Sequence, residues 1–150
     1  MPDQTTKSII VGGSVEEIYD LWANFENFPR FMKHVKSVTR TGERTSHWVA
    51  EGALGMKAEW DAEITRLEPN KRIAWRSTEG SSVKTSGQVT FNELPKGQTE
   101  VTVTLQYVAP AGKPGAKLAA MLSDLAGRLE EDLRSFKAYA ETMAARVARR

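Results

Sequence analysis

The pattern of apolar residues changes twice along the chain and divides it into three stretches. The first begins with alternation typical of a short strand, from Thr5 to Val11. Ser14 then stands three residues before Glu17, which is the spacing of a capping box at the start of a helix. The apolar positions that follow recur at helical spacing: Val15, Ile18, Tyr19, Leu21, Trp22 and Phe25. A helix is therefore predicted from Ser14. Pro29 cannot continue it, so Asn27 to Met32 is expected to form a second short helix or turn.

The middle stretch, from Val35 to Val108, has the period of two that β-strands show. It is rich in Val, Thr, Trp and Ile and is interrupted by Gly, Pro and Asn, residues that favour turns. Strands are predicted near 35–41, 44–52, 57–68, 72–78, 83–94 and 98–108. Because every connection is short, an antiparallel meander is the simplest topology.

The last stretch returns to steps of three and four residues. One amphipathic helix is predicted from about Gly115 to Met143, roughly 40 Å long and therefore able to cross the whole sheet. The complete order predicts an α+β fold in which a seven-stranded antiparallel sheet wraps around a long C-terminal helix, with two short helices after the first strand. A chain of 150 residues is expected to form one domain, residues 1–150.

Alternation along the strands places large aromatic residues on the inward face together with Ala, Ser, Thr and Gly. A tightly filled core would more often be Leu, Ile and Val throughout, so this mixture favours a partly open pocket. The residues predicted to bind a ligand there are Trp48, Trp60, Trp75, Ser77, Phe91, Tyr107, Leu122, Leu125 and Leu129. The alternative, that these aromatics only fill the core, stays open.

Two glycine- and proline-rich connections are candidate gates to this pocket. Leu54 and Met56 lie in a predicted turn, where apolar side chains are expected only if they cover something apolar. They are predicted to close over the pocket mouth and to contact the ligand. Pro110 and Pro114 are expected to set the angle at which the long helix crosses the sheet.

The ionisable residues do not have the spacing of a known catalytic or metal-binding motif. Glu59, Asp61 and Glu63 are spaced two apart on the outward face of one strand, where solvated, cross-strand paired carboxylates are expected. Neither His34 nor His47 has the spacing of a metal site, and no phosphate-binding or dinucleotide-binding loop is present. The sequence therefore predicts no catalytic residue, no metal and no cofactor.

Composition and charge narrow the functional classes further. The chain has no Cys, a formal net charge of +2 and no apolar run of membrane-spanning length. A soluble, cytoplasmic protein is expected, and the mildly basic end at Arg146, Arg149 and Arg150 is not a nucleic-acid footprint. Transient membrane contact and the oligomeric state are left open.

Several segments together resemble the polyketide cyclase/dehydrase and lipid-transport superfamily, which includes the START, Bet v 1-like and coenzyme Q-binding proteins (SRPBCC). They are Val15 to Trp22, Asn27 to Met32, Glu59 to Ile64, Ile73 to Ser77, Gly87 to Phe91, Thr99 to Val101 and Asp132 to Lys137. The resemblance implies the helix-grip fold and a cavity for a lipid, quinone or polyketide. Some members cyclise aromatic polyketides, but the superfamily shares no single catalytic motif that maps onto this chain.

The sequence thus predicts binding, as carriage or sequestration, of a small apolar or aromatic molecule. Two alternatives remain. A cyclase/dehydrase-type enzyme would need an inward ionisable group with a shifted pKa. An interaction module would need Phe25, Phe28, Phe31 and Met32 to be exposed.

Overall fold

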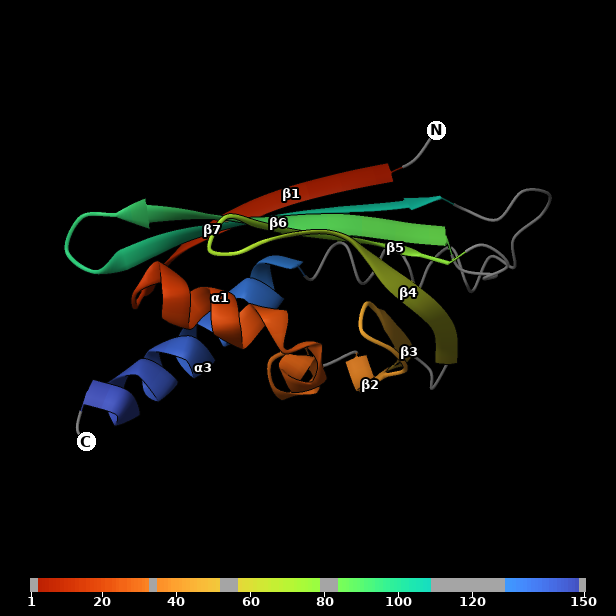
Figure 1. Cartoon of the computed structure of the whole chain (residues 1–150), viewed down its shortest axis with the longest axis horizontal. Helices are drawn as coiled ribbons and strands as arrows, with labels where there is room; N and C mark the ends of the chain where they lie inside the picture. The colour runs from red at the N-terminus through yellow and green to blue at the C-terminus, as the bar shows by residue number, and fades with distance from the viewer. Residues whose placement is uncertain (1–2, 33–34, 52–56, 79–83, 109–128, 149–150) are drawn as a thin grey trace.

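The computed structural model describes residues 3–32, 35–51, 57–78, 84–108 and 129–148 (Figure 1). These residues form a curled seven-stranded antiparallel sheet in the order β1-β7-β6-β5-β4-β3-β2. The strands are β1 Asp3–Gly12, β2 Val35–Arg40, β3 Thr45–Glu51, β4 Lys57–Glu68, β5 Arg72–Ser77, β6 Lys84–Leu94 and β7 Gln98–Val108. β2 to β7 follow one another as a meander, and β1 joins by pairing with β7. The predicted fold class is confirmed.

Turn chemistry explains why the strands end where they do. Asn70, between β4 and β5, has a positive φ of 62°, a conformation that Asn tolerates better than most residues. Between β6 and β7, Lys96 and Gly97 both have positive φ, 66° and 69°. Two successive left-handed residues match the twist of a tight hairpin, so these predicted turns lie where the sequence placed them.

The helix after β1 begins as its capping residues predict. α1 spans Val15–Ala23, and the backbone N–H of Glu17 donates to Ser14 Oγ at 3.2 Å. The Ser14 hydroxyl in turn donates to Glu17 Oε1 at 3.1 Å. The next element, η1, is a 3-10 helix at Phe25–Arg30, which begins two residues before the predicted start at Asn27.

The described part of the C-terminal helix is α3, Leu129–Ala148. It continues five residues beyond the predicted end at Met143, and its predicted first half lies outside the described residues. Figure 1 shows α1, η1 and α3 on one side of the sheet. The side chains that α3 buries at steps of three and four are Leu129, Leu133, Phe136 and Ala140.

Side-chain hydrogen bonds join α3 to the edge strand β1. Lys137 Nζ donates to the backbone oxygen of Ile10 at 3.0 Å, and the N–H of Gly12 donates to Glu141 Oε2 at 2.8 Å. Lys137 also pairs with Glu141. These contacts satisfy backbone groups that an edge strand would otherwise leave for another chain. The hydrogen bond from Lys137, followed by the one from the Gly12 N–H, lowers the pKa of Glu141 below its ordinary value.

An aromatic cluster connects the helices. Trp22 of α1 is fully buried, and its ring centroid lies 5.3 Å from that of Phe28, 6.0 Å from Phe31 and 4.8 Å from Phe136. Its Nε1–H is buried without a hydrogen-bond partner among the described residues. The environment of this donor is aromatic, and N–H groups interact weakly with ring faces.

Candidate functional site

A row of small and hydroxyl-bearing residues crosses the side of the sheet that faces the helices. In the antiparallel register Arg40 of β2 is opposite Ser46 of β3, Ser46 is opposite Ala62 of β4, and Ala62 is opposite Ser77 of β5. Thr85 of β6 continues the row, because its backbone N–H donates to Ser77 Oγ at 3.1 Å. We call Ser46, Ala62, Ser77 and Thr85 the hydroxyl row. It is a shallow strip where the sheet carries little side-chain volume.

Aromatic residues flank the hydroxyl row on both sides. On one side Trp48 is directly opposite Trp60, and their rings are stacked at 13° with centroids 6.0 Å apart. On the other side Trp75 of β5 is opposite Gly87 of β6. Trp48 and Trp75 are buried, whereas Trp60 is only partly buried. The concave face therefore has two aromatic walls with a strip of small residues between them.

Each serine of the hydroxyl row accepts a hydrogen bond through its hydroxyl oxygen. Trp48 Nε1 donates to Ser46 Oγ at 2.8 Å, and the Thr85 backbone N–H donates to Ser77 Oγ. Within the described part of the chain neither serine donates its hydroxyl hydrogen to an acceptor. Ser46 is 5% exposed, so its hydroxyl is a polar anchor inside an otherwise apolar wall.

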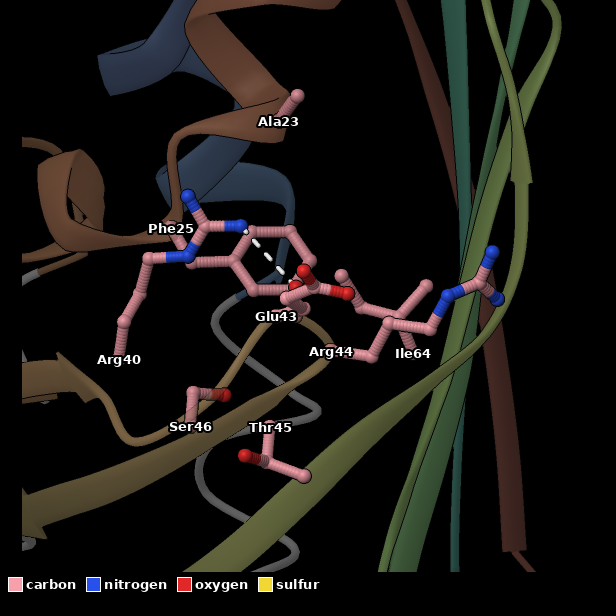
Figure 2. Close-up of a pocket in the computed structure, with 8 residues that line it drawn as sticks. All are labelled: Ala23, Phe25, Arg40, Glu43, Arg44, Thr45, Ser46 and Ile64. Atoms are coloured by element: carbon pink, nitrogen blue, oxygen red, sulfur yellow. Dashed lines mark hydrogen bonds between the residues drawn. The ribbon is translucent and has the colours of Figure 1, made fainter.

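The hydroxyl row ends at a small hollow between η1 and the β2–β3 hairpin (Figure 2). We call it the Arg40 mouth. It is lined by Ala23, Phe25, Arg40, Glu43, Arg44, Thr45, Ser46 and Ile64, and its volume is about 10 Å³. That is room for about one water molecule. Arg40 Nη2 donates to the backbone oxygen of Glu43 at 3.3 Å, so the arginine side chain lies across the rim.

The structure places the predicted ligand-binding residues in three groups. Trp48, Trp60, Trp75 and Ser77 share the concave face around the hydroxyl row. Phe91 and Leu129 are buried elsewhere: Phe91 packs edge-on against Tyr19 of α1 with centroids 5.5 Å apart, and Leu129 belongs to the core under α3. The side chains of Tyr107, Leu122, Leu125, Leu54 and Met56 lie outside the described residues.

Sequence reasoning missed Arg40. It assigned no inward residues to the strand predicted near 35–41. Val35 and Val38 are three apart and do not follow a period of two. The reason is a bulge between Val35 and Ser37, which puts Val38 opposite Trp48 and Arg40 opposite Ser46. The spacing of the two valines was the available signal.

The aromatic segment after α1 is core and not an exposed edge. Phe25, Phe28 and Phe31 are 5%, 1% and 2% exposed, and Met32 is partly buried against the same cluster. Their rings contact Trp48, Trp75 and Phe136 at centroid distances of 5.0 to 6.0 Å. The alternative of an interaction module that exposes these residues is therefore contradicted.

The acidic residues of β4 lie on the outward face, as predicted, and are paired across strands. His47 Nδ1 is 2.9 Å from Asp61 Oδ1 and its Nε2 is 3.3 Å from Glu59 Oε1, while Arg76 Nε donates to Glu63 Oε1 at 2.8 Å. The hydrogen bonds to Asp61 and then Glu59 raise the pKa of His47 above its ordinary value. Among the described residues no group of His, Asp and Glu is arranged to hold a metal ion.

Tyr19 of α1 is a further titratable group with a shifted pKa. Burial, followed by the nearby charge of Asp20, raises the pKa of Tyr19, so its phenol stays protonated near neutral pH. Tyr19, His47 and Glu141 thus have shifted pKa values. None of them belongs to the hydroxyl row or to its tryptophan walls.

Comparison with known proteins decides the family. The sequence pattern of the polyketide cyclase/dehydrase and lipid transport family matches residues 11–134. The chain belongs to this family. A family relative is an uncharacterised 17.2 kDa protein of Streptomyces lincolnensis, 34% identical over 137 residues that cover 90% of this chain and 87% of the relative.

Solved structures of an aromatase/cyclase and of a START superfamily protein share the fold of this family member. The Zhui aromatase/cyclase from Streptomyces sp. R1128 superposes with a TM-score of 0.79 at 20% identity, covering 94% of each chain. A START superfamily protein from Mycobacterium smegmatis gives a TM-score of 0.73 at 20% identity, covering 93% of this chain and 98% of that one. Family and fold together support a ligand-binding or cyclase role.

No helix in the described residues is long and apolar enough to cross a membrane.

Proposed function

We infer that this protein binds a small apolar or aromatic molecule, for carriage or sequestration, against the concave face of its sheet. The observation that supports this most directly is the pair of tryptophan walls on either side of the hydroxyl row. The Phe25 ring contacts both walls, with centroids 5.9 Å from Trp48 and 6.0 Å from Trp75. A planar molecule that takes the place of this ring would contact apolar ring surface on both sides of the row and meet the hydroxyl groups of Ser46 and Ser77 below.

The side chains of the tryptophan walls favour ligand binding over catalysis. A general acid or base needs a titratable group within hydrogen-bond reach of the substrate and a pKa suited to its task. Tyr19, His47 and Glu141, whose pKa values are shifted, lie outside the walls: on α1, on the outward face and at the junction of α3 with β1. The tryptophans and serines of the walls can position a molecule but do not exchange protons near neutral pH.

The predicted roles of Leu54, Met56, Leu122, Leu125 and Tyr107 remain part of this proposal. Leu54 and Met56 would close over the bound molecule, and Leu122 and Leu125 would cover it from the helix. The ligand is expected to be a lipid, a quinone or a polyketide-like aromatic, the classes that the superfamily resemblance implies. One domain, residues 1–150, would be sufficient for this activity.

Co-purified ligand and binding of added ligand both test the proposal. Native mass spectrometry of freshly purified protein should show a bound small molecule. A panel of quinones, fatty acids and polyphenols at ~100 μM should change tryptophan emission and raise the melting temperature, because a micromolar ligand then stabilises the protein by more than about 2 kcal/mol. If no compound changes either signal, carriage loses its main support.

A matched pair of variants locates the site. Trp60→Ala removes a partly buried wall residue, and Leu67→Ala removes a 43% exposed apolar side chain from the same strand. Trp60→Ala should weaken ligand binding while Leu67→Ala leaves it unchanged. Equal effects would show that the ligand does not lie against the tryptophan walls. Turnover of a bound aromatic polyketide, detected as a change in its absorption spectrum, would favour the cyclase instead.

A further inference from the structure

The Arg40 mouth is the described opening that reaches the hydroxyl row. We propose that it recognises an anionic group on the ligand, so that the molecule bound by this protein has an apolar or aromatic body and a carboxylate or similar acidic head. In this arrangement Arg40 holds the head at the rim, and the body lies between the tryptophan walls. The Arg44 side chain extends to the opposite side of the hollow (Figure 2), so it reaches the head by a change of rotamer. This inference rests on the proposed function and names the chemistry of its ligand.

The position of Arg40 is fixed by the sheet. Val38 and Arg40 share a face of β2, and their partners Trp48 and Ser46 are both buried on the concave side. Arg40 therefore stands at the end of the hydroxyl row, beside the serine whose hydroxyl has no acceptor among the described residues. A ligand that reaches Ser46 from outside passes this guanidinium first.

The guanidinium groups of Arg40 and Arg44 still have N–H donors that an anion could accept from. Within residues 35–51 and the other described segments, neither Arg40 nor Arg44 forms an ion pair with a carboxylate. The hydrogen bond of Arg40 goes to a neutral backbone oxygen, Glu43 O, at 3.3 Å. A carboxylate is a better acceptor for guanidinium, since charge-assisted hydrogen bonds are shorter and stronger than those to neutral oxygen. The anion would take the place of this carbonyl.

The shape of the mouth suits a head group and not the body. Its polar groups line the rim, at Arg40, Glu43, Arg44 and Thr45, whereas Phe25 and Ile64 form apolar walls. The volume of about 10 Å³ admits one water-sized group without rearrangement. Because Arg40 and Arg44 are exposed, a shift of their side chains opens the rim at little cost to the core.

Two other arginines of the sheet, Arg66 and Arg76, differ in both respects. Arg66 and Arg76 lie on the outward face and are paired with Glu68 and Glu63 at 3.0 and 2.8 Å. Replacing these two changes the net charge as much as replacing Arg40 and Arg44, but leaves the mouth intact. They are therefore the matched control.

Two fluorescent probes with the same aromatic body separate the anion from the rest of the ligand. 8-Anilino-1-naphthalenesulfonate carries a sulfonate, and N-phenyl-1-naphthylamine lacks it. Their dissociation constants are measured by emission titration on wild type, on R40Q/R44Q, on R40K/R44K and on the control R66Q/R76Q. Melting curves and circular dichroism establish that each variant is folded, because the sulfonate probe also binds partly unfolded chains.

The expected result is a loss of sulfonate-probe affinity in R40Q/R44Q of about five- to tenfold, the range for two partly exposed charge-assisted contacts. The neutral probe should stay within about twofold of wild type, R40K/R44K should retain most of the sulfonate affinity, and R66Q/R76Q should resemble wild type. If R40Q/R44Q and R66Q/R76Q lose equal affinity for the sulfonate probe, the loss is due to the change in net charge, and the inference is overturned. Equal losses for both probes would show that the arginines act through packing, which also overturns it.

The same measurements separate a failure of the proposed function from a failure of the anion site. If neither probe binds folded wild-type protein, binding at the tryptophan walls is rejected and the anion site falls with it. If both probes bind wild type and no variant distinguishes them, ligand binding stands and recognition of an anion by Arg40 and Arg44 is rejected.

Discussion

The indole of Trp75 lies so close over Gly87 that a β-carbon on residue 87 would stand 2.6 Å from Trp75 Cζ2 and 2.9 Å from Trp75 Cε2. The backbone oxygen of Thr104 would be 3.0 Å away on the neighbouring strand. Gly87 thus provides the space in which the Trp75 ring packs against the sheet. The aromatic wall on this side of the hydroxyl row depends on the absence of a side chain.

Gly87→Ala should therefore destabilise the protein and move Trp75. Overpacking of a core site costs about 1–3 kcal/mol, because a ring or a strand must shift. Chemical denaturation should show the loss of stability, and the tryptophan emission spectrum should change. A weaker ligand affinity is expected if the ring turns into the hydroxyl row.

The control for this prediction is the same substitution beside a smaller ring. In a Trp75→Phe background Gly87→Ala should cost less than in wild type, since Phe lacks the outer ring that the new methyl group meets. An unchanged cost would show that Thr104 O, and not Trp75, opposes the methyl group.

Ser46→Ala should destabilise the protein although it removes only one oxygen. Trp48 Nε1 donates to Ser46 Oγ at 2.8 Å inside the core, so the variant leaves a buried N–H without its acceptor. Such a loss costs about 1–3 kcal/mol. In a Trp48→Phe background the same substitution should be nearly neutral, and a full double-mutant cycle measured by urea denaturation checks this coupling.

The fold was predictable because its signals are local. Ser14 and Glu17 define the start of α1, and Asn70, Lys96 and Gly97 mark hairpin turns, each through the conformation of a few neighbouring residues. The length of η1 was less predictable. Phe25 fits the helical spacing of α1, but α1 ends at Ala23 because Asn24 leaves the helical conformation, with ψ 85°, and Phe25 begins the next element.

The site was predictable only in part, because it depends on register. Alternation placed Trp48, Trp60, Trp75 and Ser77 on one face, which the strand pairing shows them to share. It could not place Arg40, because a bulge shifts the register of β2 by one residue. Whether an aromatic residue lines a pocket or fills a core depends on elements far apart in sequence, as Phe91 against Tyr19 illustrates.

The stability contributed by His47 should decrease as the pH rises. Its pKa in the folded protein is raised above the ordinary 6.5 by hydrogen bonds to Asp61 and Glu59. The stabilisation is therefore fully present below the unfolded pKa and is lost as the pH passes through the higher folded pKa. Wild type should exceed His47→Gln in stability by more at about pH 6 than at about pH 9. The difference is expected to be at most ~1 kcal/mol because the pair is exposed. A difference that does not change with pH would contradict the ion pairs.

Glu141→Ala should weaken the junction between α3 and β1. The variant removes the acceptor of the Gly12 N–H and the partner of Lys137, for an expected loss of about 1–2 kcal/mol near neutral pH. The pKa of Glu141 is lowered in the fold, so its contribution is present above its ordinary value of 4.5 and disappears as the pH falls through the folded value.

Glu130→Ala is the matched control for this prediction. Glu130 lies on the same helix and forms an ion pair with Arg134 one turn later, where both side chains are exposed. Its replacement should cost less than about 0.5 kcal/mol. Equal losses for the two variants would show that Glu141 stabilises α3 itself and not its contact with β1.

The pairing of β1 with β7 joins the first strand of the chain to the last one. Ile9 is opposite Val101 and Thr6 is opposite Thr104, so strands some ninety residues apart in the sequence share one ladder of hydrogen bonds. Contacts of such long sequence separation slow folding, because the loop between them must close before they form. During synthesis β1 leaves the ribosome some ninety residues before its partner strand. During that interval other chains can contact the exposed Ile10 and the unpaired backbone of β1. The edge of the sheet is covered only after α3 has been synthesised, when Lys137 and Glu141 form hydrogen bonds with the β1 backbone.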